Sequence, residues 1–259
     1  MLSKRKLTCS FAPVLTAAII ASAGCGGGSE SVVSDTEDSR ASVASSAKPE
    51  PTLELDAPDG AFPLVWVRRG ARIEIRTEPN GGRVVEVVDK RTEYSSPTVF
   101  SVVKRAGEWA GVATPFLPNG RLGWLRLDPE RLRAGWTRLA LQVDLSERRA
   151  ALHEGDEILR SFTVTVGAPG YETPTGRFAI TDTFRGDLNR AAYGCCALAL
   201  TATQPTVPSG WLGGNRIAIH GTSGPLGVAA SHGCIRARDD EVGKLIDTVP
   251  LGAPVFIRA

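Results

Sequence analysis

The chain has 259 residues, of which 42% are hydrophobic and 22% are charged. This is the composition of an ordinary soluble globular protein, with room for one large domain or two small ones plus tails. No run of about 18 apolar residues is present, which excludes a bundle of membrane-spanning helices. The 30 basic and 28 acidic side chains leave a formal charge of +2, so nucleic acid is not expected as a partner.

Residues 1–24 have the pattern of a signal peptide. Positive residues at 4–6 precede an apolar stretch at 11–24 that is too short to span a bilayer. Small residues then lead to Cys25, and this arrangement resembles the lipobox of bacterial lipoproteins, where the cysteine is lipidated. We therefore expect an extracytoplasmic protein held at the membrane of the cell envelope by a lipid anchor at Cys25. Simple secretion, with cleavage elsewhere, is the alternative.

Residues 25–60 are predicted to form a disordered tether. The segment 26–58 carries seven Ser, three Pro, seven acidic residues and two basic residues, without apolar periodicity. Such a segment cannot bury enough surface to offset the entropy lost on ordering. It would hold a folded body away from the membrane.

Residues 61–130 are predicted to form a small β module. Turn signals containing Gly, Asn and Pro separate short apolar stretches, which suggests a small barrel. Strands are expected at 72–76, 84–88, 99–103, 109–112 and 123–125.

The end of this module, "GRLGWLRLD", resembles the close of bacterial SH3-like domains, which often accompany cell-wall enzymes. Large aromatic side chains contribute strongly to small cores. We therefore expect core packing, rather than ligand contact, for Trp66, Trp109 and Trp124.

Residues 137–259 are predicted to form a second module, mainly β with at least one helix. Apolar residues alternate over 139–145, 162–166 and 217–219, as in strands. An amphipathic helix is predicted near the end of the chain, with Asp239 as its N-cap. Its apolar positions, spaced at i, i+3, i+4 and i+7, are Val242, Leu245, Ile246 and Val249.

Reactive residue types gather in one short window of this module. The chain has only three His, and two of them, His220 and His232, lie close in sequence to Cys234. An imidazole near a thiol raises the fraction of the nucleophilic thiolate. Gly233 lets the backbone approach a reacting carbonyl and offer N–H groups to an oxyanion, and Arg236 can pair with a substrate carboxylate.

The same region resembles the L,D-transpeptidase catalytic domain of bacterial peptidoglycan synthesis. The resemblance covers about residues 138–258. It rests on "AIHGT" at 218–222, "SHGCIR" at 231–236, the turn Thr-Pro-Thr-Gly at 173–176 and the closing "VPLGAPVFIR".

This resemblance implies a β-rich sandwich and a cysteine acyltransferase without metal or organic cofactor. Cys234 matches the nucleophile and His220 the residue that deprotonates it, while His232 helps shape the site. Ser231, Gly233 and Arg236 match supporting positions, Arg236 on the peptide stem. Gly221 stands where some members have Ser, whose backbone carbonyl orients the imidazole, and Gly has that carbonyl too.

The implied reaction joins two peptidoglycan stem peptides. Cys234 forms a thioester with a tetrapeptide stem and passes it to an amine, which gives a 3-3 cross-link. The resemblance also implies acylation by carbapenem inhibitors. Two alternatives remain open: an L,D-carboxypeptidase, with water as acceptor, and a non-enzymatic lipoprotein that binds the wall through its SH3-like module.

A zinc site is the chemical rival, with ligands drawn from His220, His232, Cys234, Cys195 and Cys196. No C-x-x-C pair is present, and two adjacent cysteines suit tetrahedral ligation poorly.

The adjacent cysteines have three possible states. Cys195 and Cys196 could be buried as small apolar residues, joined as a vicinal disulfide, or bonded transiently to Cys234. The third histidine, His153, falls in a predicted hairpin and is expected at the surface.

Overall fold

The computed structural model describes residues 51–186, 188–210 and 214–259. The predicted signal peptide, Cys25 and the predicted tether up to residue 50 lie outside the described residues. Within the described ranges, no helix has both the length and the apolar character needed to cross a membrane.

The last part of the predicted tether, residues 51–60, contacts the first module. The N–H of Leu53 donates to the carbonyl of Leu127 at 2.8 Å. Leu53 and Leu55 pack against the core of this module, and Glu54 pairs with Arg105 at 2.7 Å. The structure therefore differs from the prediction of a tether that stays disordered through residue 60. The two apolar side chains Leu53 and Leu55 attach this otherwise polar segment to the core of the first module.

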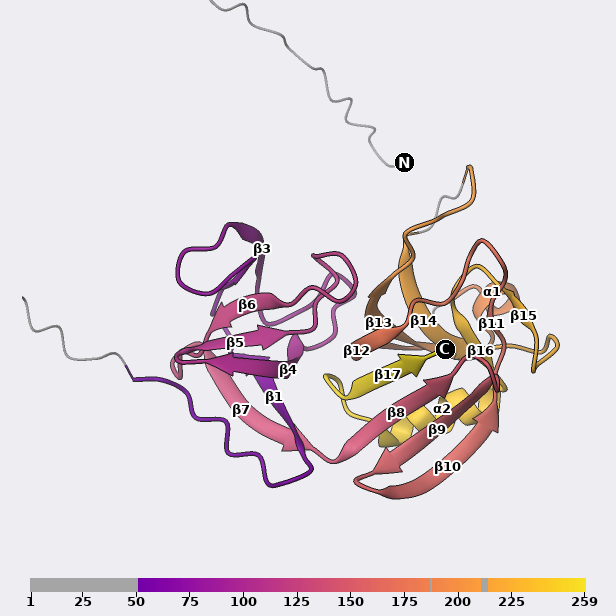
Figure 1. Cartoon of the computed structure of the whole chain (residues 1–259), viewed down its shortest axis with the longest axis horizontal. Helices are drawn as coiled ribbons and strands as arrows, with labels where there is room; N and C mark the ends of the chain where they lie inside the picture. Colours follow the sequence, from indigo (N-terminus) through magenta and orange to yellow (C-terminus); the bar gives the residue numbers. More distant parts are fainter. Residues whose placement is uncertain (1–50, 187, 211–213) are drawn as a thin grey trace, which may run out of the picture. The chain divides into compact units, whose positions relative to one another are not determined.

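The first module is one seven-stranded, barrel-like sheet (Figure 1) with the order β3-β2-β6-β5-β4-β1-β7. All of its pairings are antiparallel. The strands are β1 (Phe62–Val67), β2 (Ile73–Arg76), β3 (Val84–Val88), β4 (Val99–Ala106), β5 (Trp109–Val112), β6 (Gly123–Arg126) and β7 (Leu132–Thr137).

Trp66, Trp109 and Trp124, the three tryptophans expected in the core of this module, are only partly buried. Trp66 lies between buried Val65 and Val67 in β1, so strand alternation turns its ring away from the core. The Arg133 guanidinium stacks over the Trp66 ring at 4.4 Å. The expectation of core packing is thus wrong for Trp66, which covers the outside of the sheet.

The second module follows after a single residue, Arg138, because β7 ends at Thr137 and β8 begins at Leu139. It contains an eight-stranded sheet with the order β10-β9-β8-β17-β12-β13-β14-β16, and a two-stranded sheet, β11-β15. Its strands are β8 (Leu139–Asp144), β9 (Arg149–Glu154), β10 (Glu157–Thr163), β11 (Val166–Gly167), β12 (Gly176–Arg185), β13 (Cys196–Thr203), β14 (Arg216–Gly221), β15 (Ala229–Ser231), β16 (Ile235–Ala237) and β17 (Pro254–Arg258).

Two helices complete the described second module: α1 (Arg190–Tyr193) and α2 (Asp239–Thr248). Helix α2 contacts β13 and β14 and buries Val242 and Leu245, as the periodicity predicted. The predicted N-cap is wrong. Arg238 is the N-cap residue and makes no side-chain capping bond, while Asp239 is the first residue of the helix.

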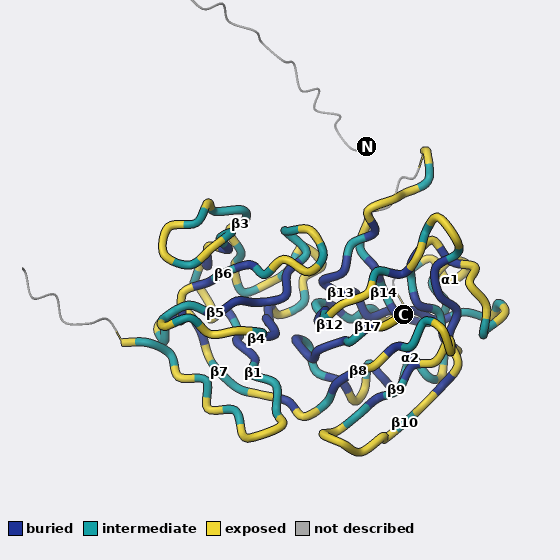
Figure 2. Tube along the Cα trace, viewed as in Figure 1, coloured by how far each residue is buried: buried dark blue, intermediate teal, exposed yellow. Residues whose placement is uncertain are grey.

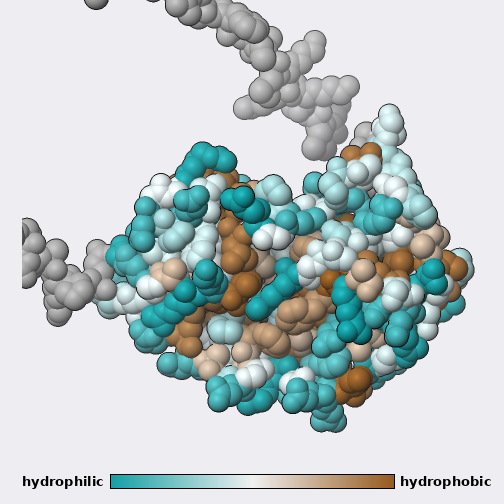
Figure 3. Space-filling view, viewed as in Figure 1, coloured by the Kyte–Doolittle hydropathy of each residue, from teal (hydrophilic) through white to brown (hydrophobic). Residues whose placement is uncertain are grey.

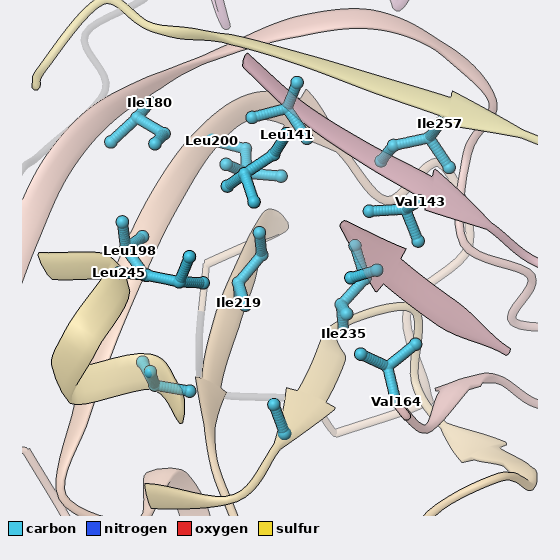
Figure 4. Packing of buried hydrophobic residues seen from close by; sticks show 14 of the residues in the cluster. Leu141, Val143, Val164, Ile180, Leu198, Leu200, Ile219, Ile235, Leu245 and Ile257 are labelled. Atoms are coloured by element: carbon cyan, nitrogen blue, oxygen red, sulfur yellow. The ribbon is translucent and has the colours of Figure 1, made fainter. Parts of the chain in front are cut away.

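The core of the second module lies between strands of the large sheet and helix α2. Figure 4 shows side chains from β8, β12, β13, β14, β16, β17 and α2 meeting there. Along the trace in Figure 2, the strands β13 and β14 are among the most buried segments. The predicted mainly β class with at least one helix is confirmed. On the face drawn in Figure 3, apolar residues form separate patches among polar ones.

Candidate active site

A parallel strand pair positions the reactive residues. In the β14–β16 ladder Ile219 pairs with Ile235, and His220 pairs with Arg236. Ile219 and Ile235 are fully buried in the core. Because side chains alternate along a strand, His220 and Arg236 leave the other face of the sheet together. Cys234 directly precedes β16. It lies two residues before Arg236, so strand alternation places it on the same face as Arg236.

These residues line one cavity of about 330 Å³. Its walls include two of the three histidines and the free thiol. The sequence-predicted members that line it are His220, His232, Cys234 and Arg236, and they are joined by Tyr193 and Thr222.

The imidazole of His220 is held on its Nδ1 side. This atom lies 2.9 Å from the carbonyl oxygen of Gly221, so in the neutral ring Nδ1–H donates to that oxygen and Nε2 carries the lone pair. The ring also packs edge-on against Tyr193, with 5.1 Å between ring centroids. Gly221 therefore makes the backbone contact that the resemblance implies, although it is not Ser.

Burial lowers the pKa of His220 below its usual range, and the charge of Arg236 acts in the same direction. The backbone groups of Gly221 and Tyr193 and the charge of Asp239 oppose this shift in pKa. The side chain is only 2% exposed. His220 is consequently a neutral imidazole at neutral pH, in the form that can accept a proton.

Burial raises the pKa of the Cys234 thiol, against a hydrogen bond from the backbone of Ala218 and the charge of Arg236. Its resting form is thus the neutral thiol. A neutral thiol and a neutral imidazole line one cavity, so attack by the sulfur would require transfer of its proton to a base such as this imidazole.

Ser231 fixes the turn that carries the thiol. It is 1% exposed, and its hydroxyl donates to the carbonyl of Cys234 at 2.6 Å and accepts from the N–H of Gly233 at 3.1 Å. The N–H of Gly233 is thus used by Ser231, and the expectation that the backbone of this turn offers N–H groups to an oxyanion stays a prediction.

Gly233 is required for a different reason. Its φ is +107°, a conformation that residues with a Cβ rarely adopt. A Cβ there would lie 2.3 Å from Nε2 of Gln204 and 2.9 Å from Cδ1 of Ile217. Both the backbone and the surrounding atoms thus exclude other residues.

Two buried side chains hold this turn from outside, and neither was predicted as a site residue. The hydroxyl of Thr173 donates to the carbonyl of Gly233 at 2.8 Å and accepts from the N–H of Gly167 at 2.9 Å. The amide of Gln204 donates to the carbonyl of His232 at 3.1 Å. Thr173 belongs to the Thr-Pro-Thr-Gly turn on which the resemblance partly rests. The sequence pattern identified that turn but did not predict its contact with Gly233. Gln204 gave no signal, since a single Gln after a run of Ala and Thr has no distinctive pattern.

His232 lies at the rim of the cavity. Its residue is exposed, and its ring packs edge-on against Tyr171, with 5.0 Å between centroids. The expectation that His232 helps shape the site stays a prediction.

The adjacent cysteines form a disulfide with each other. Cys196 is 3% exposed, and Cys195 packs against the same core. Cys234 is the free thiol of the described residues. Burial and a vicinal disulfide, weighed as alternatives, therefore occur together.

No group of three or more His, Cys, Asp or Glu in the described ranges is arranged to hold a metal ion. The zinc hypothesis drew on Cys195 and Cys196, whose sulfur atoms are bonded to each other. His153, the remaining histidine, lies in β9 and is partly buried.

The comparisons with known proteins concern this same module. The family model of the YkuD L,D-transpeptidase catalytic domain matches residues 138–257. The YkuD protein of Bacillus licheniformis, whose name assigns it to the L,D-transpeptidases, is 30% identical over 119 residues, which are 45% of this chain and 64% of that protein. ErfK/SrfK of Escherichia coli, also named as an L,D-transpeptidase, is 29% identical over 161 residues, covering 56% of this chain and 52% of that protein.

Among solved structures, L,D-transpeptidase 3 of Mycobacterium tuberculosis with a faropenem-derived adduct has a TM-score of 0.40 and 14% identity, covering 53% of this chain and 73% of that one. Bd1075 of Bdellovibrio bacteriovorus has a TM-score of 0.39 and 23% identity, covering 47% and 48%. The sequence matches therefore carry the comparison, and they agree that residues 138–257 are similar to the YkuD L,D-transpeptidase catalytic domain. The chain spans less than two thirds of the curated relatives it matches.

The contacts of Thr173 can be tested by Thr173→Val, which keeps the shape and removes the hydroxyl. The buried N–H of Gly167 and the buried carbonyl of Gly233 would then lose their partner, and each such loss costs about 1–3 kcal/mol. We expect a fall of about 2 kcal/mol or more in the free energy of unfolding, measured in urea, together with slower alkylation of Cys234. Thr175→Val, at an exposed position of the same turn, should change stability by less than about 0.5 kcal/mol. Equal stabilities for the two variants would contradict the assignment.

The resting protonation state predicts the pH dependence of the site. Because the pKa of Cys234 is raised, thiolate absorbance at 240 nm should be absent at pH 7 and appear only above about pH 8.5. Because the pKa of His220 is lowered, acylation should persist at pH 6.5 and fall only at lower pH, as the imidazole becomes protonated. Cys234→Ala supplies the absorbance background. A thiolate signal already present at pH 6 would show a resting ion pair instead.

Proposed function

We propose that this protein is an L,D-transpeptidase of peptidoglycan biogenesis that joins two stem peptides through a 3-3 cross-link. The observation that carries the proposal is the presence of a free, partly buried thiol and a neutral, oriented imidazole at one cavity. The family of residues 138–257 supports acyl transfer as the class of reaction.

The first half-reaction forms the acyl-enzyme. Nε2 of His220 takes the proton of the Cys234 thiol while the sulfur attacks the carbonyl carbon of the third residue of a tetrapeptide stem. The imidazolium then gives this proton to the departing nitrogen, and the terminal D-amino acid leaves as the C–N bond breaks. A thioester between the sulfur and the stem remains, and His220 is neutral again.

The second half-reaction uses an amine, the side-chain amine of a neighbouring stem. The amine attacks the thioester carbonyl, His220 accepts its proton, and that proton passes to the sulfur as the C–S bond breaks. Proximity supports transfer to an amine over water, since well-positioned reactants reach effective molarities of about 10⁵ M or more.

Arg236 is proposed to bind the donor stem. Its Nε is buried and has no hydrogen-bond partner in the structure, and its charge acts on both Cys234 and His220. A buried, unsatisfied guanidinium N–H is costly, and a substrate carboxylate or carbonyl would satisfy it.

The nucleophile and the base are tested separately. Cys234→Ala should abolish acylation, because it removes the free thiol of the cavity. His220→Ala should slow acylation by about 10²–10⁴-fold or more, since the thiol is protonated at rest, and His232→Ala should have a smaller effect. The readout is the mass of the protein after incubation with a carbapenem. The wild type should gain the mass of one carbapenem molecule, on the peptide that contains Cys234. Labelling of Cys195 or Cys196 instead would show that Cys234 is not the nucleophile.

The acceptor is tested with purified tetrapeptide muropeptides as both donor and acceptor. We expect 3-3 cross-linked dimers to outnumber hydrolysed tripeptides by mass spectrometry. Tripeptides alone, at high acceptor concentration, would make the protein an L,D-carboxypeptidase. Binding to isolated wall without turnover of any stem would favour the non-enzymatic alternative, with residues 61–130 as an SH3-like binding module.

We also propose that the protein is a lipoprotein at the cell envelope. The support is sequence alone: a positive start, a short apolar stretch and small residues before Cys25. Acyl chains on one cysteine contribute about 0.8 kcal/mol per buried CH₂ to membrane binding. Cys25→Ala should therefore move the protein from the membrane fraction to the soluble fraction. A wild-type protein that is already soluble would contradict the anchor.

A further inference from the structure

The carboxylate of Asp239 lies in a notch formed by two glycines. A Cβ on Gly221 would lie 2.1 Å from Oδ1 of Asp239, and a Cβ on Gly194 would lie 2.3 Å from the same atom. Contacts this short exclude a side chain at both positions while the carboxylate is in place. Oδ1 is buried and has no hydrogen-bond partner in the structure.

The two glycines belong to the two backbone segments that hold His220. The carbonyl of Gly221 accepts from Nδ1 of the imidazole. Gly194 follows Tyr193, whose ring packs on the imidazole and whose backbone hydrogen-bonds to it. One buried carboxylate thus touches both segments that orient the ring.

The charges around His220 give this carboxylate an electrostatic role. Cys234 and Arg236 face the imidazole from β16 and the turn before it, Tyr193 faces it from α1, and Asp239 faces it from α2. Arg236 opposes a positive imidazole, and Asp239 is the negative group that offsets it. The imidazole becomes positive only when it takes the thiol proton.

We propose that Asp239 is a positioning residue for His220, whose carboxylate fixes the Gly221 and Gly194 backbones and stabilises the imidazolium formed during proton transfer. This inference rests on the proposed proton transfer from Cys234 to His220. It also explains Gly221, the position where the resemblance leads to Ser in some members: a Ser side chain would collide with Asp239.

The charge is tested by Asp239→Asn, which keeps the shape of the side chain. Asp240→Asn is the matched control, since Asp240 is exposed in the same turn and pairs with Lys244 at 2.8 Å. With only three histidines in the chain, the imidazole of His220 can be followed by NMR during a pH titration and assigned with His220→Gln. We expect the pKa of His220 to fall in Asp239→Asn, because a negative charge near the imidazole is removed, and to stay unchanged in Asp240→Asn. Equal shifts in both variants, or none in Asp239→Asn, would overturn the proposal.

The notch is tested by a double-mutant cycle, which stays informative if Asp239→Asn folds poorly. Gly221→Ser should lower the melting temperature and slow alkylation of Cys234 by iodoacetamide, because its Cβ meets Oδ1. Adding Asp239→Ala should recover part of both losses, so that the two substitutions are not additive. Additive losses would show that the two residues do not share this space.

The pKa of His220 and the double-mutant cycle are both measured without turnover of a stem peptide. If stems are not cross-linked but the pKa and the cycle behave as expected, the proposed function fails and the role of Asp239 stands. If stems are cross-linked and the pKa of His220 does not respond to Asp239→Asn, only this inference fails.

Discussion

The site depends on the parallel pairing of β14 with β16. The ladder places Ile219 opposite Ile235 in the core and His220 opposite Arg236 above it. Because the register of a strand sets the face of every side chain, a slip by one residue would send the imidazole into the core and an isoleucine into the cavity. The apolar pair thus fixes the register on which the reactive pair depends. One face of this strand pair packs in the core, and the other face carries the candidate reactive residues.

Burial of the site determines its protonation. The same desolvation that raises the pKa of the Cys234 thiol lowers the pKa of the His220 imidazole, so both groups rest in their neutral forms. An ion pair formed before substrate arrives would need to be stabilised permanently in a poorly solvated cavity. In the proposed mechanism separated charge exists only during proton transfer, and Arg236 and Asp239 are the charged groups that act on the two residues involved.

The sequence predicted about half of the strands, those in which polar and apolar residues alternate. Ile73, Glu74 and Ile75 alternate in burial as they alternate in polarity. Of the four predicted apolar positions of helix α2, the helix buries Val242 and Leu245. Strand β13 was not predicted. Its residues from Cys196 to Ala202 are buried on both faces, so small and apolar residues follow one another without alternation.

Within the site, the sequence revealed the reactive groups but not the residues that hold them. Cys234 and His220 stand out because they are rare and close in sequence. Thr173 and Gln204 reach the turn from other parts of the chain, and their polar side chains are ordinary in local sequence. From the local sequence Asp239 was predicted to be the N-cap of helix α2, because acidic residues are common at helix starts. Its contact with Gly221 and Gly194 needs the folded chain.

The segment Ser-His-Gly-Cys therefore specifies a backbone as well as a thiol. The carbonyls of His232, Gly233 and Cys234 are each bonded by a different side chain, those of Gln204, Thr173 and Ser231 respectively. A turn with three consecutive carbonyls fixed has little freedom to change φ and ψ, so the sulfur starts from one position relative to Nε2 of His220. Reactions that require a near-attack geometry lose rate steeply when the reacting atoms are misplaced by about 1 Å. In the proposed reaction these hydroxyl and amide contacts would therefore contribute without touching the substrate, and Gly233 supplies the positive φ that the turn requires.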